Sequence, residues 1–520
     1  MKVVLLFVLF LKINEQNAEE TRKNILCIFS MASPSHHIWN KALKESLASK
    51  GHNITALSIT TEQTTNPNLH YLELDGIYEA LYSGDKPFDL LEFAQKSVLG
   101  ITKDTIDFFI KICRASLKSK GVKTLLNYPD NFKVDLVIFD YTNLPCLHGF
   151  VAKFNHPPQI GVTAFANPVQ TSDMTGSPNF ASIKPHYVTN LGASMTFLER
   201  LYNSMHYIFD VWQRRFSIWW VNAEVQVVFK DKTLNIGDLE NDVDLVLVSS
   251  HSGMDIPEPV LPNIIQVAGL QIKEPKPLSN DLKQFIESST KGAVLFSLGT
   301  NLKSEIIGDA KINMFISAIS RFSDYNFLWK IELKNKTFPK NMLVRQWMPQ
   351  NDILAHPKIK LFITHGGLLS SQEATWHGVP ILGMPFFVDQ YTNVQKSVDA
   401  GVGERLDFMT LTEDIIVEKL EKLLQKNSYK EKMLLRSKRF RDRPMHPLQE
   451  AVWWCEYIIR HKGAPHLKSQ ARYMDASALF MWDILVVLLA AAFTVLYLMY
   501  AIIRRIVYKK ENVYDDKKIN

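Results

Sequence analysis

The sequence predicts an α/β protein made of two Rossmann-like domains that face each other across a cleft, with one apolar helix near the C-terminus. Short apolar runs bounded by turn residues alternate with helix-length segments, which is the pattern of β-α-β units and a parallel sheet. The alternation occurs twice, and a proline-rich passage from Pro257 to Pro277 separates the two series. At 520 residues, with 46% hydrophobic and 22% charged residues, the chain has room for two or three folded domains.

The first series of elements begins at Asn24. An apolar run at Asn24–Ser30 precedes a helical segment at His37–Lys50, and a second strand-like run then extends to Ile59. Further strands of this series are predicted at Val134–Asp140, Gln159–Thr163 and Leu245–Ser249. Because parallel strands end at one edge of their sheet, ligand-binding residues are expected to gather at that edge.

The second series follows the proline-rich passage. It comprises a strand at Ala293–Leu298, a helical segment at Ala310–Phe322, and strand-like runs near Phe327 and Met342. A further apolar run at Ile359–Thr364 leads into the most informative stretch of the chain, which extends to Gln390.

This stretch places a His-Gly-Gly triplet at 365–367, where a helix begins. A helix N-terminus offers unpaired backbone N–H groups and a positive dipole end, so it forms an anion site. Glu373 lies two turns into the helix, and Gly378 is placed to end it. A second apolar run then leads to Asp389 and Gln390. The sequence thus predicts an anion site and an acid/amide pair at the carboxyl edge of one sheet.

The whole stretch resembles the signature of the UDP-glycosyltransferases, from its His-x-Gly start to the closing Asp-Gln pair. Upstream, the pentapeptide Gln-Trp-Met-Pro-Gln at 346–350 also matches, as do the segments 354–357 and 460–464. The resemblance extends from Asn24 to the tail, and it is closest to the insect branch of the membrane-bound animal enzymes.

The resemblance implies the GT-B architecture, with an acceptor-binding domain at 19–265 and a UDP-sugar-binding domain at 278–475. It implies inverting transfer of a sugar from a UDP-sugar to small lipophilic acceptors. UDP-glucose is the favoured donor and UDP-glucuronate is the alternative. The mechanism implied needs no metal ion and no cofactor, because the UDP-sugar is a co-substrate. The sequence leaves the acceptor and the oligomeric state open.

Five residues of the second domain are implied to bind the uridine and the sugar. Trp347 is expected to stack on uracil, while Gln350 bonds the base or ribose. Glu373 is placed to accept hydrogen bonds from the ribose hydroxyls. Asp389 and Gln390 are expected to bind sugar hydroxyls.

The diphosphate is implied to be held by His365, the amides near Gly367, and Ser297 with Thr300. This leaving group gains negative charge as the glycosidic bond breaks, so fixed donors stabilise the transition state more than the ground state. One departure from the family pattern is Leu369, where many vertebrate relatives carry Asn, and it removes a polar contact.

The first domain is implied to supply the base. His36, in the sequence Pro-Ser-His-His, matches the position of the family's catalytic histidine, and Asp140 ends a strand at the matching acidic position. Both residues follow strands of one sheet, so they are expected to lie on the cleft side. Asp140 would orient the His36 imidazole and stabilise its charge.

Three alternative functions compete with this interpretation. A lipase-like hydrolase needs a G-x-S-x-G motif, which the sequence lacks. A metal-dependent transferase would use a pair such as Asp242 and Asp244, but that pair precedes a strand and so lies at the wrong edge. A non-catalytic nucleotide-sugar-binding relative would be indicated by loss of the His36/Asp140 pair, and both residues are present.

Two apolar segments predict the compartment. Residues 1–18 have the form of a secretory signal peptide. Residues 480–503 contain a charge-free run long enough for one transmembrane helix, and the tail at 504–520 begins with two arginines, as the positive-inside rule expects. The sequence therefore predicts a single-pass type I protein with a lumenal body. Lys517 and Lys518 resemble a dilysine address for the endoplasmic reticulum membrane.

Other features of the sequence narrow the range of functions. The net charge of +6 is spread along the chain, so no basic face for nucleic acid is indicated. Asn53 and Asn335 begin glycosylation sequons. The four cysteines show no CxxC pattern, and buried thiols are favoured over a disulfide framework. The segment 194–229 is either a membrane-contacting amphipathic helix or ordinary core.

Overall fold

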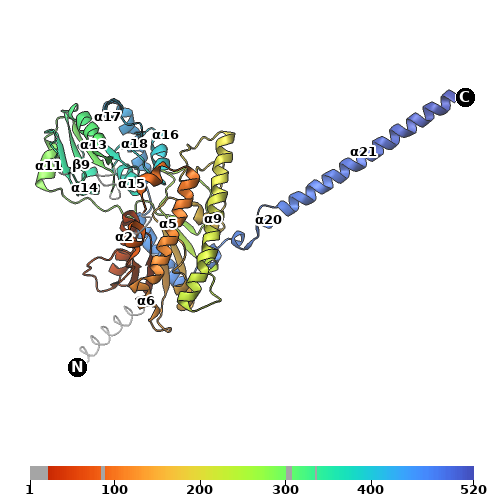
Figure 1. The fold of residues 1–520 in the computed structure, drawn as a ribbon, viewed down its shortest axis with the longest axis horizontal. Coiled ribbons are helices and arrows are strands. Elements are labelled where there is room, and N and C mark those ends of the chain that lie inside the picture. The colour runs from red at the N-terminus through yellow and green to blue at the C-terminus, as the bar shows by residue number, and fades with distance from the viewer. Residues whose placement is uncertain (1–21, 84–87, 300–306, 334–335, 520) are drawn as a thin grey trace, which may run out of the picture. The chain divides into compact units, whose positions relative to one another are not determined.

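The computed structural model describes residues 22–83, 88–299, 307–333 and 336–519. The chain divides into a body that ends at Lys468 and a C-terminal unit that begins at Ser469. Within the body, two parallel sheets form two halves (Figure 1). The expected signal peptide, Thr300 and Asn335 lie outside the described residues.

The first half is built on a sheet whose described strands have the order β3-β2-β1-β4-β5-β6-β7. Its strands are β1 (Asn24–Phe29), β2 (Asn53–Ser58), β3 (Leu69–Glu73), β4 (Leu136–Asp140), β5 (Gln159–Thr163), β6 (Leu245–Val248) and β7 (Ile264–Gln266). Each neighbouring pair is parallel. Ile25 and Cys27 face one hydrophobic core, while Leu26 and Ile28 face another, because successive side chains of a strand point to opposite faces. Both faces of the sheet are therefore covered, as a parallel sheet requires.

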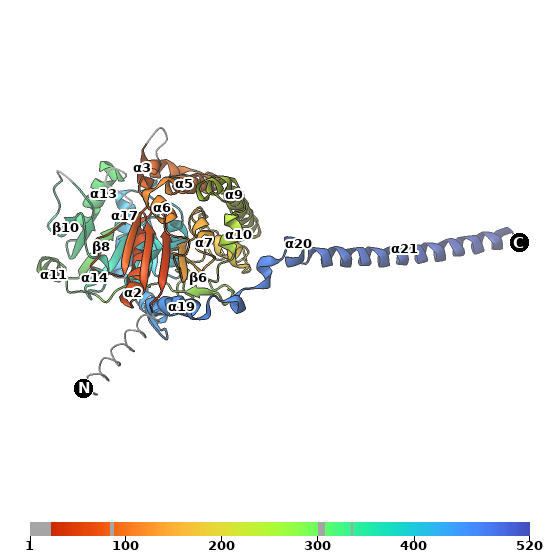
Figure 2. The same cartoon turned by 90° about the horizontal axis from the view of Figure 1, so that it is seen from below.

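Helices of the first half cover these two faces (Figure 2). They are α2 (Pro34–Ser49), α3 (Ile77–Tyr82), α4 (Leu90–Gln95), α5 (Val98–Lys118), α6 (Lys120–Leu126), α7 (Gly149–Lys153), α8 (Val169–Thr175), α9 (Phe197–Phe229) and α10 (Ile236–Asn241). Helix α2 starts at Pro34, a residue suited to the first helical position, and buries Trp39, Leu43 and Leu47 at helical spacing.

The second half is built on a parallel sheet whose described strands have the order β10-β9-β8-β11-β12-β13. Its strands are β8 (Gly292–Ser297), β9 (Tyr325–Lys330), β10 (Met342–Arg345), β11 (Ile359–Thr364), β12 (Ile381–Gly383) and β13 (Gly403–Arg405). Its helices are α11 (Asn280–Glu287), α13 (Asp309–Ser320), α14 (Gln350–Leu354), α15 (Leu368–Trp376), α16 (Gln390–Asp399), α17 (Glu413–Gln425) and α18 (Asn427–Arg441). The two Rossmann-like domains predicted from the sequence are thus present.

The last helix of the body returns to the first half. Helix α19 (Pro447–His461) buries Ala451, Cys455 and Ile458 in the core that covers β1 and α2. The segment that follows α18 therefore belongs to the first sheet by packing, although the sequence-based range 278–475 places it in the second domain. Its buried residues carry no sequence mark of which sheet they cover.

Two further details differ from the sequence-based expectation. Strand β7 lies inside the proline-rich passage that was predicted to be a linker. Cys113 of α5 and Cys146, in the segment after β4, form a disulfide across 33 residues of sequence, so the preference for thiols was wrong for this pair. Cys27 and Cys455 are free and buried, as expected.

The C-terminal unit contains α20 (Ala476–Leu479) and the long helix α21 (Trp482–Ile519). Within the described residues, Trp482–Tyr508 is the one helical stretch long and apolar enough to cross a membrane. This agrees with the predicted span at 480–503 by length and composition.

Candidate active site

The carboxyl edge of the first sheet brings together His36 and Asp140. His36 lies in the first turn of α2, directly after β1, and Asp140 is the last residue of β4, the neighbour of β1 in the sheet. The His36 Nδ1 atom is 2.8 Å from Asp140 Oδ2, and both side chains are buried. The pairing predicted from the sequence is therefore present. If Asp140 accepts the Nδ1 hydrogen, Nε2 is the ring nitrogen left for a substrate.

Other groups keep Asp140 ionised. Burial opposes its charge, but the His36 imidazole and hydrogen bonds from His36 and Thr142 outweigh it, so the Asp140 pKa lies below its usual value. The Thr142 backbone N–H donates to Asp140 Oδ1 at 3.0 Å, and Asn40 Nδ2 donates to Oδ2 at 3.1 Å. Sequence reasoning missed Asn40, although it lies one turn after His36 on the same helix face.

The adjacent histidine points elsewhere. His37 Nε2 is 2.8 Å from Glu62 Oε1, so the two histidines have different carboxylate partners. Neighbouring residues of a helix project in different directions. The Phe165 and His36 rings pack in a T-shaped arrangement, with 5.1 Å between ring centroids.

In the second half, the His365 ring packs in space against Gly299 and Gly367. A Cβ atom on Gly299 would come within 2.8 Å of the His365 ring, and one on Gly367 within 2.6 Å. Gly367 precedes α15, so its neighbouring amides lie at a helix N-terminus. Burial and the charge of Lys330 lower the pKa of His365 to about 4, so the imidazole is neutral at pH 7. Ser297 is buried, and its Oγ accepts a hydrogen bond from the Gly299 N–H at 3.4 Å.

Lys330 is a candidate that the sequence reasoning missed. It is the last residue of β9, which neighbours β8, so the same edge rule would have found it. Burial lowers its pKa, and the charge of Glu373 partly offsets that effect. Its ammonium group is therefore close enough to influence both His365 and Glu373.

The expected uridine-binding residues divide into a half-buried pair and an exposed ring. Gln350 Nε2 donates to Glu373 Oε2 at 2.8 Å and to Ser370 Oγ at 3.1 Å. Burial raises the pKa of Glu373 to about 7, although Gln350 and Lys330 oppose the shift. The Trp347 side chain is 69% exposed, so its indole face is available for a base to stack on.

Asp389 and Gln390 lie at the start of α16, after a strained residue. Val388 has φ of 53°, in the left-handed region that a β-branched residue rarely adopts. Burial raises the pKa of Asp389 to about 6, while Asn393 and the charge of His36 oppose the shift. Its Oδ2 accepts a hydrogen bond from Asn393 Nδ2 at 2.7 Å. Asp389 lines the same cavity as Phe165, which contacts His36, so the site joins the two halves.

The side-chain oxygen of Gln390 forms hydrogen bonds within its own loop. Its Oε1 accepts hydrogen bonds from the backbone N–H groups of Phe386 at 2.9 Å and Phe387 at 3.3 Å. Of the two ends of this amide, Nε2 is therefore the one left to meet a sugar hydroxyl.

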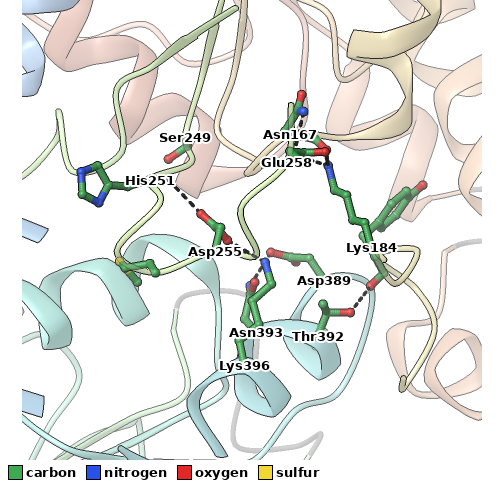
Figure 3. Close-up of polar contacts among 12 residues, drawn as sticks. Asn167, Lys184, Ser249, His251, Asp255, Glu258, Asp389, Thr392, Asn393 and Lys396 are labelled. Atoms are coloured by element: carbon green, nitrogen blue, oxygen red, sulfur yellow. Dashed lines mark hydrogen bonds and ion pairs between the residues drawn. The ribbon is translucent and has the colours of Figure 1, made fainter. Parts of the chain in front are cut away.

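A small cavity of about 60 Å³ lies between the halves beside Asp389 (Figure 3). Its charged walls are arranged as ion pairs. Lys184 lies 2.7 Å from Glu258, and Lys396 lies 2.6 Å from Asp255. Asp389 adds a carboxyl group to these two balanced pairs. Phe165, which packs on His36, also lines the cavity, so the cavity adjoins the His36–Asp140 pair.

The carboxylates considered as a metal motif lie at the opposite edge of the first sheet. Asp242 and Asp244 precede β6, and Lys468 Nζ approaches them at 2.9 and 3.1 Å. Asp244 also accepts hydrogen bonds from the backbone N–H groups of Gln159 and Ala464, each at 3.0 Å. These contacts give the pair a structural role in holding the segment after α19.

The chain is similar to known proteins over almost its whole length. The family described as "UDP-glucoronosyl and UDP-glucosyl transferase" matches residues 26–518. UDP-glucosyltransferase 2 of Dactylopius coccus is 31% identical over 488 residues, covering 92% of this chain and 93% of that protein. UDP-glucuronosyltransferase 2B15 of Homo sapiens is 28% identical over 484 residues, covering 89% and 90%.

Solved structures share the fold. The calicheamicin glycosyltransferase CalG4 superposes with a TM-score of 0.56 at 17% identity, covering 85% of this chain and 99% of that one. The spinosyn forosaminyltransferase SpnP gives 0.55 at 17% identity, covering 84% and 99%. The two facing parallel sheets are therefore a GT-B fold. With the family match over residues 26–518, the chain belongs to the UDP-glucuronosyl and UDP-glucosyl transferase family and is a UDP-glycosyltransferase.

Proposed function

We propose that the enzyme transfers glucose, with inversion and without a metal ion, from UDP-glucose to a hydroxyl group of small lipophilic acceptors. The observation that carries this proposal is the His36–Asp140 pair of the first half, whose neighbour Phe165 lines the same cavity as Asp389 of the second half. A base for the acceptor and a carboxyl group for the sugar thus meet in one site.

In the proposed reaction, His36 Nε2 takes the proton of the acceptor hydroxyl while the acceptor oxygen attacks C1 of the sugar. The bond from C1 to the diphosphate oxygen breaks, and UDP leaves with the electron pair. Asp140 stabilises the imidazolium that forms, as a carboxylate does beside other catalytic histidines. Attack on the face opposite UDP converts an α-linked donor into a β-glycoside.

The donor groups have matching partners in the second half. The exposed Trp347 ring suits uracil, and the Gln350–Glu373 pair suits the ribose hydroxyls. The helix N-terminus after Gly367 and the neutral His365 offer hydrogen-bond donors to the diphosphate, and Lys330 adds a positive charge.

The charges beside Asp389 favour a neutral sugar over glucuronate. The two lysines of the cavity are each paired with a carboxylate, and Asp389 carries a further carboxyl group. A glucuronate carboxylate would meet no unpaired cation among these walls and would repel Asp389. Apolar walls such as Phe165 and Val169 support lipophilic acceptors.

The decisive experiment is a donor and acceptor screen on the purified full-length chain, with UDP release and product anomer as readouts. We expect a β-glucoside from UDP-glucose, weak or no product from UDP-glucuronate, and full activity in EDTA. An α-product, or activity that EDTA abolishes and a divalent metal restores, would overturn the mechanism. Binding of UDP-glucose without turnover of any acceptor would favour a non-catalytic binding protein.

The base is tested with His36→Ala. We expect turnover of an aliphatic alcohol to fall by roughly 10²–10⁴-fold with UDP affinity nearly unchanged. An acidic phenol, already partly ionised, should lose much less. Transfer to the aliphatic alcohol at the wild-type rate would remove His36 from the mechanism, and His37 would be substituted next.

For the location of the protein, we propose a single-pass anchor at α21, with the body in the lumen of the endoplasmic reticulum. The stretch Trp482–Tyr508 is apolar up to Ile503, and Arg504 and Arg505 near its C-terminal end support this orientation. In intact microsomes the body should resist added protease while the tail is cleaved. Digestion of the body without detergent would contradict the topology. Replacement of Lys517 and Lys518 should release the protein from the endoplasmic reticulum.

A further inference from the structure

From Asn203 to Ser217, helix α9 is mostly polar where it packs on the body, and along its length it is apolar where it faces outward. A surface helix of a soluble protein has the reverse arrangement. Its buried side includes the polar residues Asn203, His206, Asp210, Gln213, Arg214 and Ser217. Its exposed large side chains are Phe197, Leu198, Leu201, Tyr202, Met205, Ile208, Trp212, Phe216, Trp219, Trp220 and Val227. We call this exposed set the outer face of α9.

The charged residues of the polar inner side have specific partners, which favours the observed orientation of the helix. Arg214 forms a buried pair with Glu240, with nitrogen–oxygen distances of 2.7 and 2.9 Å. Asp210 Oδ2 is 3.0 Å from His186 Nε2. If the helix were turned to bury its aromatic residues, Asp210 and Arg214 would move away from His186 and Glu240. Those buried partners would then be left unpaired, at a large cost in folding free energy.

The outer face is long, continuous and almost free of charge. All residues of α9 are described, and two charged side chains near this face, Arg215 and Glu224, are paired with Asp173 and Arg114. The rings form a contiguous row, with 5.8 Å between the centroids of Trp212 and Phe216 and 5.7 Å between Phe216 and Trp219. Figure 1 shows α9 along the outside of the first half, beside α5. An apolar surface of this extent marks an interaction site.

We propose that the outer face of α9 lies in the interfacial layer of a lipid bilayer and docks the body on it. Tryptophan and tyrosine favour the membrane–water interface, and the face carries three exposed tryptophans and Tyr202. The same chain holds a helix that meets the length and composition of a membrane span. A bilayer is therefore the apolar phase that this face meets at high local concentration.

The helix lies on the membrane without crossing it. Its inner side packs Ile218, Val221 and Val225 into the body, so lipid can reach one side only. The alternative to a bilayer on the outer face of α9 is a second copy of the chain.

The inference does not depend on the identity of the sugar donor or on catalysis, because it rests on the packing and exposure of α9.

The first test measures the depth of single labels in the full-length protein, reconstituted in phosphatidylcholine vesicles. Cys27 and Cys455 are buried and Cys113 is bonded to Cys146, so an introduced cysteine is the reactive one. A fluorophore is attached at Ile208→Cys or Trp219→Cys, with Glu431→Cys on the exposed side of α18 as control. Lipids with nitroxide on the acyl chain should quench the α9 labels several-fold more than the control. Equal quenching at all three positions would overturn the proposal.

The second test separates α9 from α21. A protease site inserted between Met474 and Asp475 allows the body to be cut from α21 after reconstitution. The cut body should stay on the vesicles in 1 M salt, and the Trp212→Glu/Trp219→Glu variant should be released, with its thermal midpoint unchanged because both side chains are exposed. Release of the unsubstituted body, or cross-linking of Ile208→Cys between two copies in place of lipid quenching, would reject the bilayer as occupant.

Discussion

At the scale of single residues, the fully buried Asp140 is kept charged by its neighbours. Its depressed pKa means that it contributes stability above its ordinary pKa, and this contribution is lost as the pH falls through the depressed value. The carboxylate accepts from His36, Asn40 and Thr142 together, so its position is defined from three directions.

The Asp140→Asn variant should lose turnover while it keeps its affinity for UDP. An amide can present a donor to His36 and favour the wrong tautomer, so we expect kcat to fall by about 10²–10⁴-fold. The matched control is Asn40→Ala, which removes one hydrogen bond to Asp140 and leaves the charge; its kcat should fall by about tenfold at most. Equal losses in both variants would show that packing matters more than the charge. Steady-state kinetics and UDP titration provide both readouts.

Glu373 should make UDP binding depend on pH. Its pKa of about 7 leaves most of the carboxyl protonated at pH 6, where it is a poor acceptor for ribose hydroxyls. We therefore expect UDP to bind about tenfold more weakly at pH 6 than at pH 8. UDP is the better ligand for this test, because it lacks the sugar expected at Asp389. Calorimetry at both values checks the assignment, with Glu373→Gln as the control that should bind weakly and keep only the pH dependence of the UDP phosphate itself.

The same shifts have a consequence for stability. The raised pKa values of Glu373 and Asp389 mean that the folded protein without ligand holds protons that the unfolded chain releases. Their contribution is complete below the ordinary values of 4.5 and 3.8, and it is lost as the pH rises through about 7 and about 6. Donor binding opposes this by offering partners to the ionised forms.

At the scale of elements, the turn after β8 is shaped around His365. Gly299 has φ of +83°, and its missing Cβ leaves room for the imidazole. Gly308, just before α13, has φ of +77° with open space where a Cβ would lie. Both glycines have a positive φ, but a Cβ atom would meet the His365 ring at Gly299 and nothing at Gly308.

This difference makes a matched pair of variants. Gly299→Ala and Gly308→Ala should each lose about 1–2 kcal/mol of stability, because alanine is strained at these φ values. Gly299→Ala should in addition weaken UDP binding by at least about tenfold, since its Cβ displaces His365, a donor worth more than about 1.4 kcal/mol when it meets a charged group. A Gly308→Ala variant with equally weakened UDP binding would contradict this account. Thermal unfolding and UDP titration separate the two effects.

At the scale of the whole molecule, the two halves are joined by a buried glutamine. Gln372, on α15 of the second half, donates through Nε2 to the Ser249 carbonyl oxygen at 2.9 Å. Its Oε1 accepts from the backbone N–H of Gly269 at 3.0 Å and from Gln271 Nε2 at 3.3 Å. The residue is 1% exposed, so these bonds are shielded from solvent.

Gln372→Ala should destabilise the contact between the halves. Several buried polar groups lose their partners at once, which costs about 2–4 kcal/mol. We expect chemical denaturation to change from one transition to two, as the sheets unfold separately. Gln395→Ala, which removes a hydrogen bond from the surface of α16, should shift stability by no more than about 0.5 kcal/mol. A single unchanged transition for Gln372→Ala would argue that other contacts between the halves, such as the Lys396–Asp255 pair, are enough to hold them together.

The sequence by itself determined the family, the fold class and the apolar C-terminal helix. Those properties depend on local patterns: the periodicity of β1 and β11, the glycines around His365, and a long charge-free run. It also predicted that His36 and Asp140 meet, because the ends of neighbouring parallel strands share an edge. The roles of the donor-binding residues stay predictions.

Only the tertiary structure decided what depends on contacts distant in sequence. Helix α19 covers the first sheet, and Cys113 pairs with Cys146, although no spacing in the sequence marks either choice. The orientation of α9 is the clearest case. Its aromatic and polar residues allow either core packing or an exposed apolar face, and partners elsewhere in the chain, such as Glu240 and His186, bury the polar side. A buried charge requires a partner more strictly than an aromatic ring requires burial, so those partners set the direction of the helix.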